Sequence, residues 1–134
     1  MESVGAWKRD LLLDHPAGRA GACADSARAT YVRGDARIDV YITDMIRVCT
    51  GRPGTGAGMV RAAVSGGGGT KAVSVAKHPG VLAGGHLPAL TIWIADRCQM
   101  TAQVSAGNVL PEDALALAER LISPALARVC AARQ

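Results

Sequence analysis

An alternation of apolar and polar residues in the first third of the chain constrains the fold more than any other feature of the sequence. From Ile38 to Ile42 every second residue is a branched apolar one, and the residues between them are polar. This period of two is typical of a strand with one buried face and one exposed face. The RGD triplet at 33–35 has the composition of a turn. We therefore predict a hairpin of two strands, 30–32 and 37–44.

Further strand patterns follow in the second half of the chain. A short strand is predicted at 71–76, and the HPG triplet at 78–80 should end it. The segments LTIWI at 90–94 and QMTAQVS at 99–105 are close together and alternate in the same way. We expect them to form a second antiparallel hairpin whose apolar side chains share one face.

The last third of the chain carries the signals of a helix. Pro111 suits a first helical position because its missing N–H is not needed there, and Glu112 and Asp113 favour the positive end of the helix dipole. The expected apolar stripe consists of Leu115, Ala118, Leu121 and Ile122. The Ser-Pro pair at 123–124 should break and restart the helix. Strands followed by a helix predict an α+β fold, with an antiparallel sheet of about 4–6 strands packed against a C-terminal helix.

The sequence predicts an N-terminal arm, residues 1–28, and a single α+β domain, residues 29–134. The arm is expected to hold a short helix around 7–13 and a linker of small residues. No secretory signal is recognised in it, because only three leucines follow Lys8 and Arg9. The protein would be periplasmic if a leader precedes this chain, and cytoplasmic otherwise.

Charge and hydropathy exclude two classes of partner. The chain has 15 Lys and Arg against 11 Asp and Glu, which gives a net charge of +4 without a basic stripe. Nucleic-acid binders usually show such a stripe with stacking aromatics, so no nucleic-acid partner is expected. Acidic residues and a proline interrupt the apolar run at 110–121, which is also shorter than the ~20 residues of a membrane span.

The four cysteines leave the redox state open. Cys23, Cys49, Cys98 and Cys130 are widely spaced and form no CxxC motif, so neither a thioredoxin-like redox motif nor a structural zinc site is indicated. Four cysteines allow three disulfide pairings. An oxidising compartment would favour disulfides, and the cytoplasm would favour free thiols. The GGGGTK segment at 66–71 lies in a glycine-rich connection and lacks the residue order of a phosphate-binding loop, so no cofactor is predicted.

One group of polar residues has side chains that could bind a metal ion or form a cysteine-based catalytic site. His78, His86 and Cys98 would converge as metal ligands if the 78–89 segment folds over the second hairpin. Alternatively, His86 would activate Cys98 as a nucleophile, with Asp96 as orienting group or fourth metal ligand. The simpler interpretation is that both histidines cap turns and that Cys98 packs inside the sheet.

Three residues, Asp96 among them, stand at expected strand ends, where loop side chains often bind ligands. They are Asp44, Asp96 and Arg97. Turn formation explains Asp96 equally well, because aspartate bonds readily to its own backbone in turns.

From residue 30 onward the order of features resembles that of small exported proteobacterial proteins. The resemblance lies in YVRGDARIDVYITD, the KHPG at 77–80, LTIWIADRCQMTAQV and the closing PALARV. Such proteins are similar to the α/β sandwich of photosystem accessory (PsbP) and Mog1-like proteins, which act as binding or assembly factors. The chain departs from this pattern in having Cys98 where an aromatic residue usually follows Asp-Arg. The resemblance implies a binding role and identifies no ligand.

Three functional hypotheses result. The first is a non-enzymatic domain that binds a protein partner or assists assembly in the bacterial envelope, through a sheet face or the 50–69 connection. The second is a small metal- or thiol-dependent enzyme that uses His78, His86, Asp96 and Cys98. The third is self-association through the apolar run around Trp93.

Overall fold

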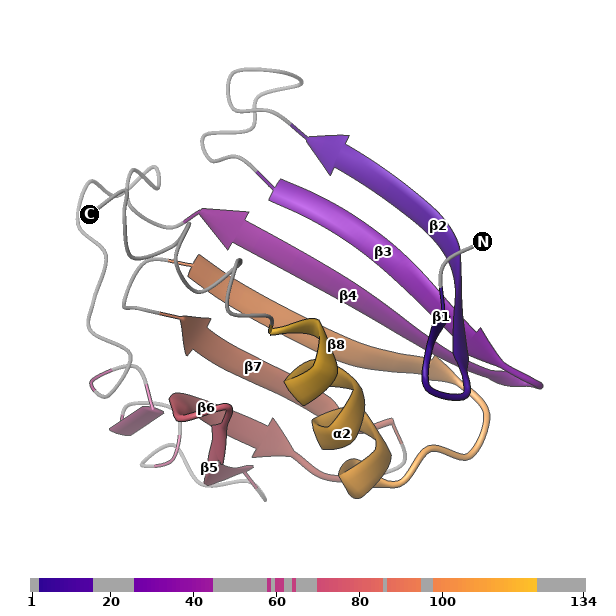
Figure 1. The fold of residues 1–134 in the computed structure, drawn as a ribbon. Coiled ribbons are helices and arrows are strands. Elements are labelled where there is room, and N and C mark those ends of the chain that lie inside the picture. Colours follow the sequence, from indigo (N-terminus) through magenta and orange to yellow (C-terminus); the bar gives the residue numbers. More distant parts are fainter. Residues whose placement is uncertain are drawn as a thin grey trace.

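The computed structural model describes residues 3–15, 26–44, 58, 60–61, 64, 70–85, 87–94 and 98–122. Within them, seven strands of six to nine residues and one two-residue strand form a single antiparallel sheet (Figure 1). The strands are β1 (Ser3–Val4), β2 (Trp7–His15), β3 (Ser26–Arg33), β4 (Ala36–Asp44), β5 (Thr70–Val75), β6 (His78–Ala83), β7 (Ala89–Ile94) and β8 (Cys98–Ala106). Helix α2 (Pro111–Leu121) packs against one face of this sheet.

The sheet consists of two antiparallel meanders that meet in its middle. Its strand order is β1-β2-β3-β4-β8-β7-β6-β5, so β4 and β8 are the central pair. In this pair Ile38 lies opposite Val104, and Ile42 lies opposite Met100. The apolar residues predicted to alternate in β4 therefore face those of β8 on the side that α2 covers.

The predicted α+β class, with an antiparallel sheet and a C-terminal helix, is confirmed. The predicted number of strands, about 4–6, is too low, because β1, β2 and β6 were not anticipated. Both predicted hairpins are present, as β3 with β4 and as β7 with β8. In the second of them Leu90 lies opposite Ala102 and Ile92 opposite Met100, on one buried face as expected.

The prediction of a short helix around 7–13 is wrong, because this segment forms strand β2. It pairs with β3 from Lys8 opposite Val32 to His15 opposite Ser26, with an irregularity between Arg9 and Leu11. Pairing with β3 supplies backbone partners that an isolated short helix would lack. Trp7 is only 5% exposed and belongs to the main core cluster, so the arm contributes to the core.

The HPG triplet does not end a strand as expected, because β6 begins at His78. The turn lies earlier, at Ala76 and Lys77, which both have positive φ values, 49° and 72°. Two consecutive positive φ values are typical of the tight two-residue turns that join antiparallel strands. Gly80 then lies inside the sheet, where an added Cβ would come within 2.7 Å of the carbonyl oxygen of Thr91.

The predicted helix start is confirmed, with Pro111 at the first position and the N–H of Leu110 donating to the Asp113 carboxylate (3.3 Å). The buried face differs from the predicted stripe. It consists of Ala114, Leu117, Ala118 and Ile122, whereas Leu115 and Leu121 are partly buried. The small residues Ala114 and Ala118 face the sheet and let the helix approach it closely. The predicted break at 123–124 lies outside the described residues.

The core lies between α2 and the sheet. Its fully buried side chains include Ile38, Leu82, Leu90, Ile92, Ile94, Met100, Val104 and Leu117. Of the glycine-rich connection, only residues 58, 60–61 and 64 are described, and they are helical. No helix of the described residues has the length and apolar character needed to cross a membrane.

Candidate functional site

The residues predicted to form a metal or thiol site are only partly described. His78 is the half-buried first residue of β6, and Cys98 is the buried first residue of β8, so strand β7 separates them. Asp44 ends β4 opposite Cys98. His86, Asp96 and Arg97 lie outside the described residues, so the convergence of the set stays a prediction. The described residues contain no group of three or more His, Cys, Asp or Glu placed to hold a metal ion.

Cys98 is disulfide-bonded. In this form its sulfur is not a thiolate, and both nucleophilic attack and metal binding by cysteine require the thiolate. A catalytic or metal-binding role for Cys98 would therefore require prior reduction. Cys23, Cys49 and Cys130 lie outside the described residues, so the pairing stays open.

Trp93, the centre of the hypothesis of self-association, is only 8% exposed. It lies on the sheet face opposite α2, since its neighbours Ile92 and Ile94 belong to the core under the helix. Its indole N–H is buried and has no hydrogen-bond partner. With so little free surface, Trp93 itself contributes little to an interface unless the face around it rearranges.

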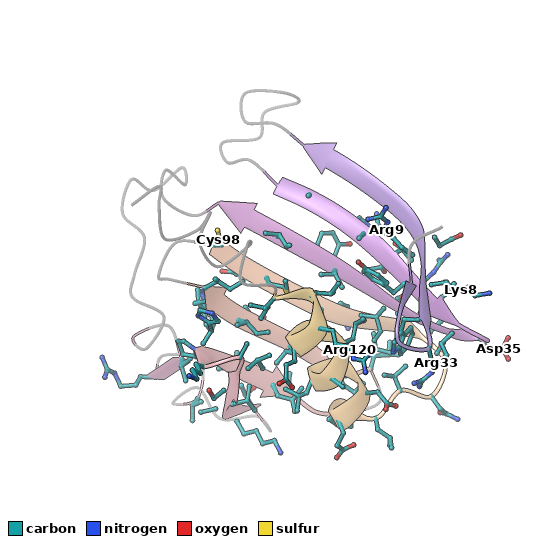
Figure 2. The ribbon with its side chains drawn as sticks, viewed as in Figure 1. Lys8, Arg9, Arg33, Asp35, Cys98 and Arg120 are labelled. Atoms are coloured by element: carbon teal, nitrogen blue, oxygen red, sulfur yellow. The ribbon has the colours of Figure 1, made fainter. Side chains whose placement is uncertain are left out.

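A hollow that the sequence did not predict lies between the β1–β2 hairpin and α2. Its volume is ≈ 160 Å³, and we call it the hairpin–helix cleft. It is lined by Gly5, Ala6, Trp7, Arg33, Asp113, Ala116, Leu117 and Arg120. Figure 2 shows that Arg33 and Arg120 both lie near the β1–β2 hairpin, at the end of the sheet far from Cys98.

Local features of the chain explain the shape of the cleft. Gly5 has a φ of +61°, which allows the turn into β2, and an added Cβ there would lie 3.1 Å from Nη1 of Arg120. On α2, the residues Asp113, Ala116 and Arg120 follow one another at helical spacing and share one side of the helix. Because Ala116 is small, it leaves the space between Asp113 and Arg120 open. Buried Trp7 lines the wall that the hairpin contributes.

Two independent contacts hold the guanidinium of Arg33. Its Nη2 donates to Oδ2 of Asp113 at 3.2 Å, and its Cζ lies 4.4 Å from the centre of the Trp7 ring. The second contact is a cation–π interaction, which arginine forms well with tryptophan. The side chains of Arg33 and Asp113 are 36% and 33% exposed, so water screens their ion pair while the guanidinium remains accessible.

Among the described residues that line the cleft, Arg120 is the charged side chain without an ion pair. It is exposed, it lies in the last turn of α2, and none of the described residues forms an ion pair with it. Two guanidinium groups and one carboxylate give the cleft a net charge of +1. Such an arrangement is suited to bind an anionic group through charge-assisted hydrogen bonds.

A second polar cluster lies on the opposite face of the sheet. Asp39 Oδ1 accepts hydrogen bonds from Thr30 Oγ1 (2.7 Å) and Arg28 Nη2 (3.4 Å). Burial by itself would raise the pKa of Asp39, but hydrogen bonds from Thr30, Ser105 and Arg28 together with the positive charge of Arg28 leave this pKa below its ordinary value. Because the carboxylate is already satisfied inside the protein, this cluster stabilises the sheet and is a poorer candidate for ligand binding.

The chain matches no protein-family model, no curated protein and no solved structure. The resemblance to photosystem accessory and Mog1-like proteins therefore stays a prediction. The geometry of the cleft is the basis for a functional assignment.

Proposed function

We propose that the chain is a non-enzymatic domain that binds a protein partner and that the hairpin–helix cleft is its contact site. One observation carries the proposal: two arginines line a hollow of ≈ 160 Å³ whose wall includes the buried Trp7. Arginine is enriched among the residues that dominate the binding energy of protein interfaces. Sites for drug-sized molecules and cofactors are about 300–1,000 Å³, so a hollow of this size suits a single side chain of a partner better.

The resemblance to proteins that act as binding or assembly factors supports the same class of function. An assembly role in the bacterial envelope belongs to this proposal. In that role the domain would hold a segment of another protein, and the cleft would receive one anchoring residue of that segment.

The experiment selects binders from a displayed library of random 12-residue peptides on the purified chain. The variant Ala116→Leu fills the cleft at an exposed helix position, and leucine is nearly as good a helix former as alanine. The matched control, Ala72→Leu, makes the same change at an exposed position of β5, which does not line the cleft.

We expect selected peptides to bind the unchanged chain and the Ala72→Leu variant with equal affinity. Binding to Ala116→Leu should be at least about tenfold weaker, because a central anchor that loses its pocket costs more than about 1.4 kcal/mol. Circular dichroism of the three proteins verifies that they fold alike. Absence of any saturable peptide, or equal binding to the filled cleft, would overturn the proposal.

A further inference from the structure

We infer that the group received by the hairpin–helix cleft is a carboxylate, the acidic side chain of a partner protein, bound between Arg33 and Arg120 beside Trp7. This inference rests on the proposed function, since it names the chemistry of the partner at the same site. It follows from the net charge of the cleft, from the fixed position of the Arg33 side chain and from the size of the cleft.

The charge of the cleft matches a group with one negative charge. Asp113 already neutralises one of the two guanidiniums, and Arg120 has no ion pair among the described residues. A carboxylate would therefore bring the cleft to neutrality. A phosphate group carries about −1.5 to −2 at pH 7, and the excess would lie next to Asp113.

The two arginines differ in how far they are ordered in advance. Arg33 is held by Asp113 and by the Trp7 ring, so its planar fork is in place before a ligand arrives. A planar fork matches the two oxygens of a carboxylate, and prior ordering reduces the entropy lost on binding. Arg120 is exposed, has no ion-pair partner in the part of the chain that the structure describes, and supplies its charge from the α2 side of the cleft.

The size and lining of the cleft suit a glutamate side chain. At ≈ 160 Å³ the cleft is smaller than the sites of about 300–1,000 Å³ that hold drug-sized ligands, and it is of a size to receive one side chain. Glutamate has five heavy atoms beyond Cα, three carbons and two oxygens. Its methylenes would lie against Ala116 and Leu117, while its oxygens reach the two guanidiniums. The missing Cβ of Gly5 leaves room for the Arg120 guanidinium, which lies next to this residue.

The experiment is an NMR titration of the whole chain with acetyl-Gly-Gly-Glu-Gly-Gly-amide, followed at the indole N–H signals. The chain has two tryptophans, and Trp7 lines the cleft whereas Trp93 lies on the other face of the sheet. Trp93 is therefore an internal control within the same spectrum. The peptide with Gln in place of Glu has nearly the same shape without the charge.

We expect the Glu peptide to shift the Trp7 signal saturably while the Trp93 signal stays in place. The Gln peptide should bind at least about tenfold more weakly, because a charge-assisted hydrogen-bond pair is lost. The variant Arg120→Gln should show a loss of similar size. The same change at exposed Arg61, which does not line the cleft, should leave the affinity unaltered.

Equal binding of the Glu and Gln peptides, equal shifts of both indoles, or no shift at all would overturn the carboxylate assignment. Inorganic phosphate binding tenfold more tightly than the Glu peptide would overturn it in favour of phosphate.

The two proposals fail in different ways. Peptides that depend on an open cleft but lack acidic residues would end the carboxylate assignment and leave the protein-binding function intact. Charge-dependent binding of the Glu peptide, with no peptide that is sensitive to Ala116→Leu, would end the protein-binding function and leave a carboxylate site.

Discussion

The guanidinium of Arg33 and the carboxylate of Asp113 are 80 residues apart in the sequence and 3.2 Å apart in the structure. The oxygen of Asp113 that accepts this bond, Oδ2, also accepts the backbone N–H of Leu110. One carboxylate thus stabilises the first turn of α2 and ties that turn to the end of β3. The contact places the side of α2 that carries Arg120 against the β1–β2 hairpin.

The Arg33–Asp113 ion pair should contribute only modestly to stability. A double-mutant cycle of Arg33→Ala and Asp113→Ala is expected to give a coupling of about 0.5 kcal/mol, because both side chains are about one-third exposed. Urea unfolding of the four proteins measures it, and 1 M NaCl should reduce it through screening. A coupling of several kcal/mol that does not respond to salt would show that the pair is desolvated.

Docking of α2 should depend on one buried leucine. Leu117→Ala is expected to lower the free energy of unfolding by about 2–5 kcal/mol, since the side chain is 2% exposed and its loss leaves a cavity. Leu110→Ala makes the same chemical change at a residue that is 64% exposed, and should stay within about 0.5 kcal/mol. Both values come from urea denaturation. Similar values for the two variants would contradict the packing of α2 against the sheet.

The lowered pKa of Asp39 predicts a dependence of stability on pH. A carboxylate whose pKa is lower in the folded state contributes stability above its unfolded pKa, about 3.9. That contribution is lost as the pH falls through the folded value. Asp39→Asn should therefore be less stable than the unchanged chain at pH 7, by about 1–3 kcal/mol.

The difference should shrink between pH 5 and the acid limit of folding, because the unchanged chain loses its advantage as Asp39 becomes protonated. Urea denaturation at a series of pH values provides the test. Thr43→Val, at a half-buried position on the same strand, is a control that should show no such convergence. If the difference in stability between Asp39→Asn and the unchanged chain stays constant from pH 7 to pH 3, ionisation of Asp39 does not cause it.

Cys98 should be found in a disulfide when the protein is isolated without reductant. Peptide mapping should link it to Cys23, Cys49 or Cys130 and so identify the pairing. Reduction is expected to lower the free energy of unfolding by about 2–4 kcal/mol, the usual contribution of a disulfide. Recovery of Cys98 as a free thiol from protein kept under oxidising conditions would contradict this state and reopen the thiol hypothesis.

Local sequence patterns were sufficient to predict strands with one buried face and the start of the helix. The alternation from Ile38 to Ile42 and the Pro111 start each predicted the correct element. The β2 segment has no clean alternation, because three leucines follow one another, and only its pairing with β3 shows that it is a strand. Without knowledge of that partner, the sequence could not separate a strand from a helix.

The cleft could not be predicted because its residues come from three distant segments, and each has an adequate local explanation. Arg33 belongs to a turn sequence, Asp113 to a helix start and Arg120 to the basic end of a helix. The tertiary fold brings them together, and no spacing within the chain records it. The one indication was Trp7, a large aromatic residue in a segment that otherwise had no expected core contact.

The central pairing of β4 with β8 gives the molecule an approximate two-fold arrangement. Each half of the sheet is one continuous meander, and counting outward from the centre meets the strands of both halves in the same order. The antiparallel β4·β8 contact is thus an intramolecular counterpart of an isologous interface between two subunits. Residues 3–44 and 70–122 are in this sense two partners on one polypeptide. Among the described strands, the β4·β8 pair joins the two partners, and every other hydrogen-bonded strand pair lies within one of them.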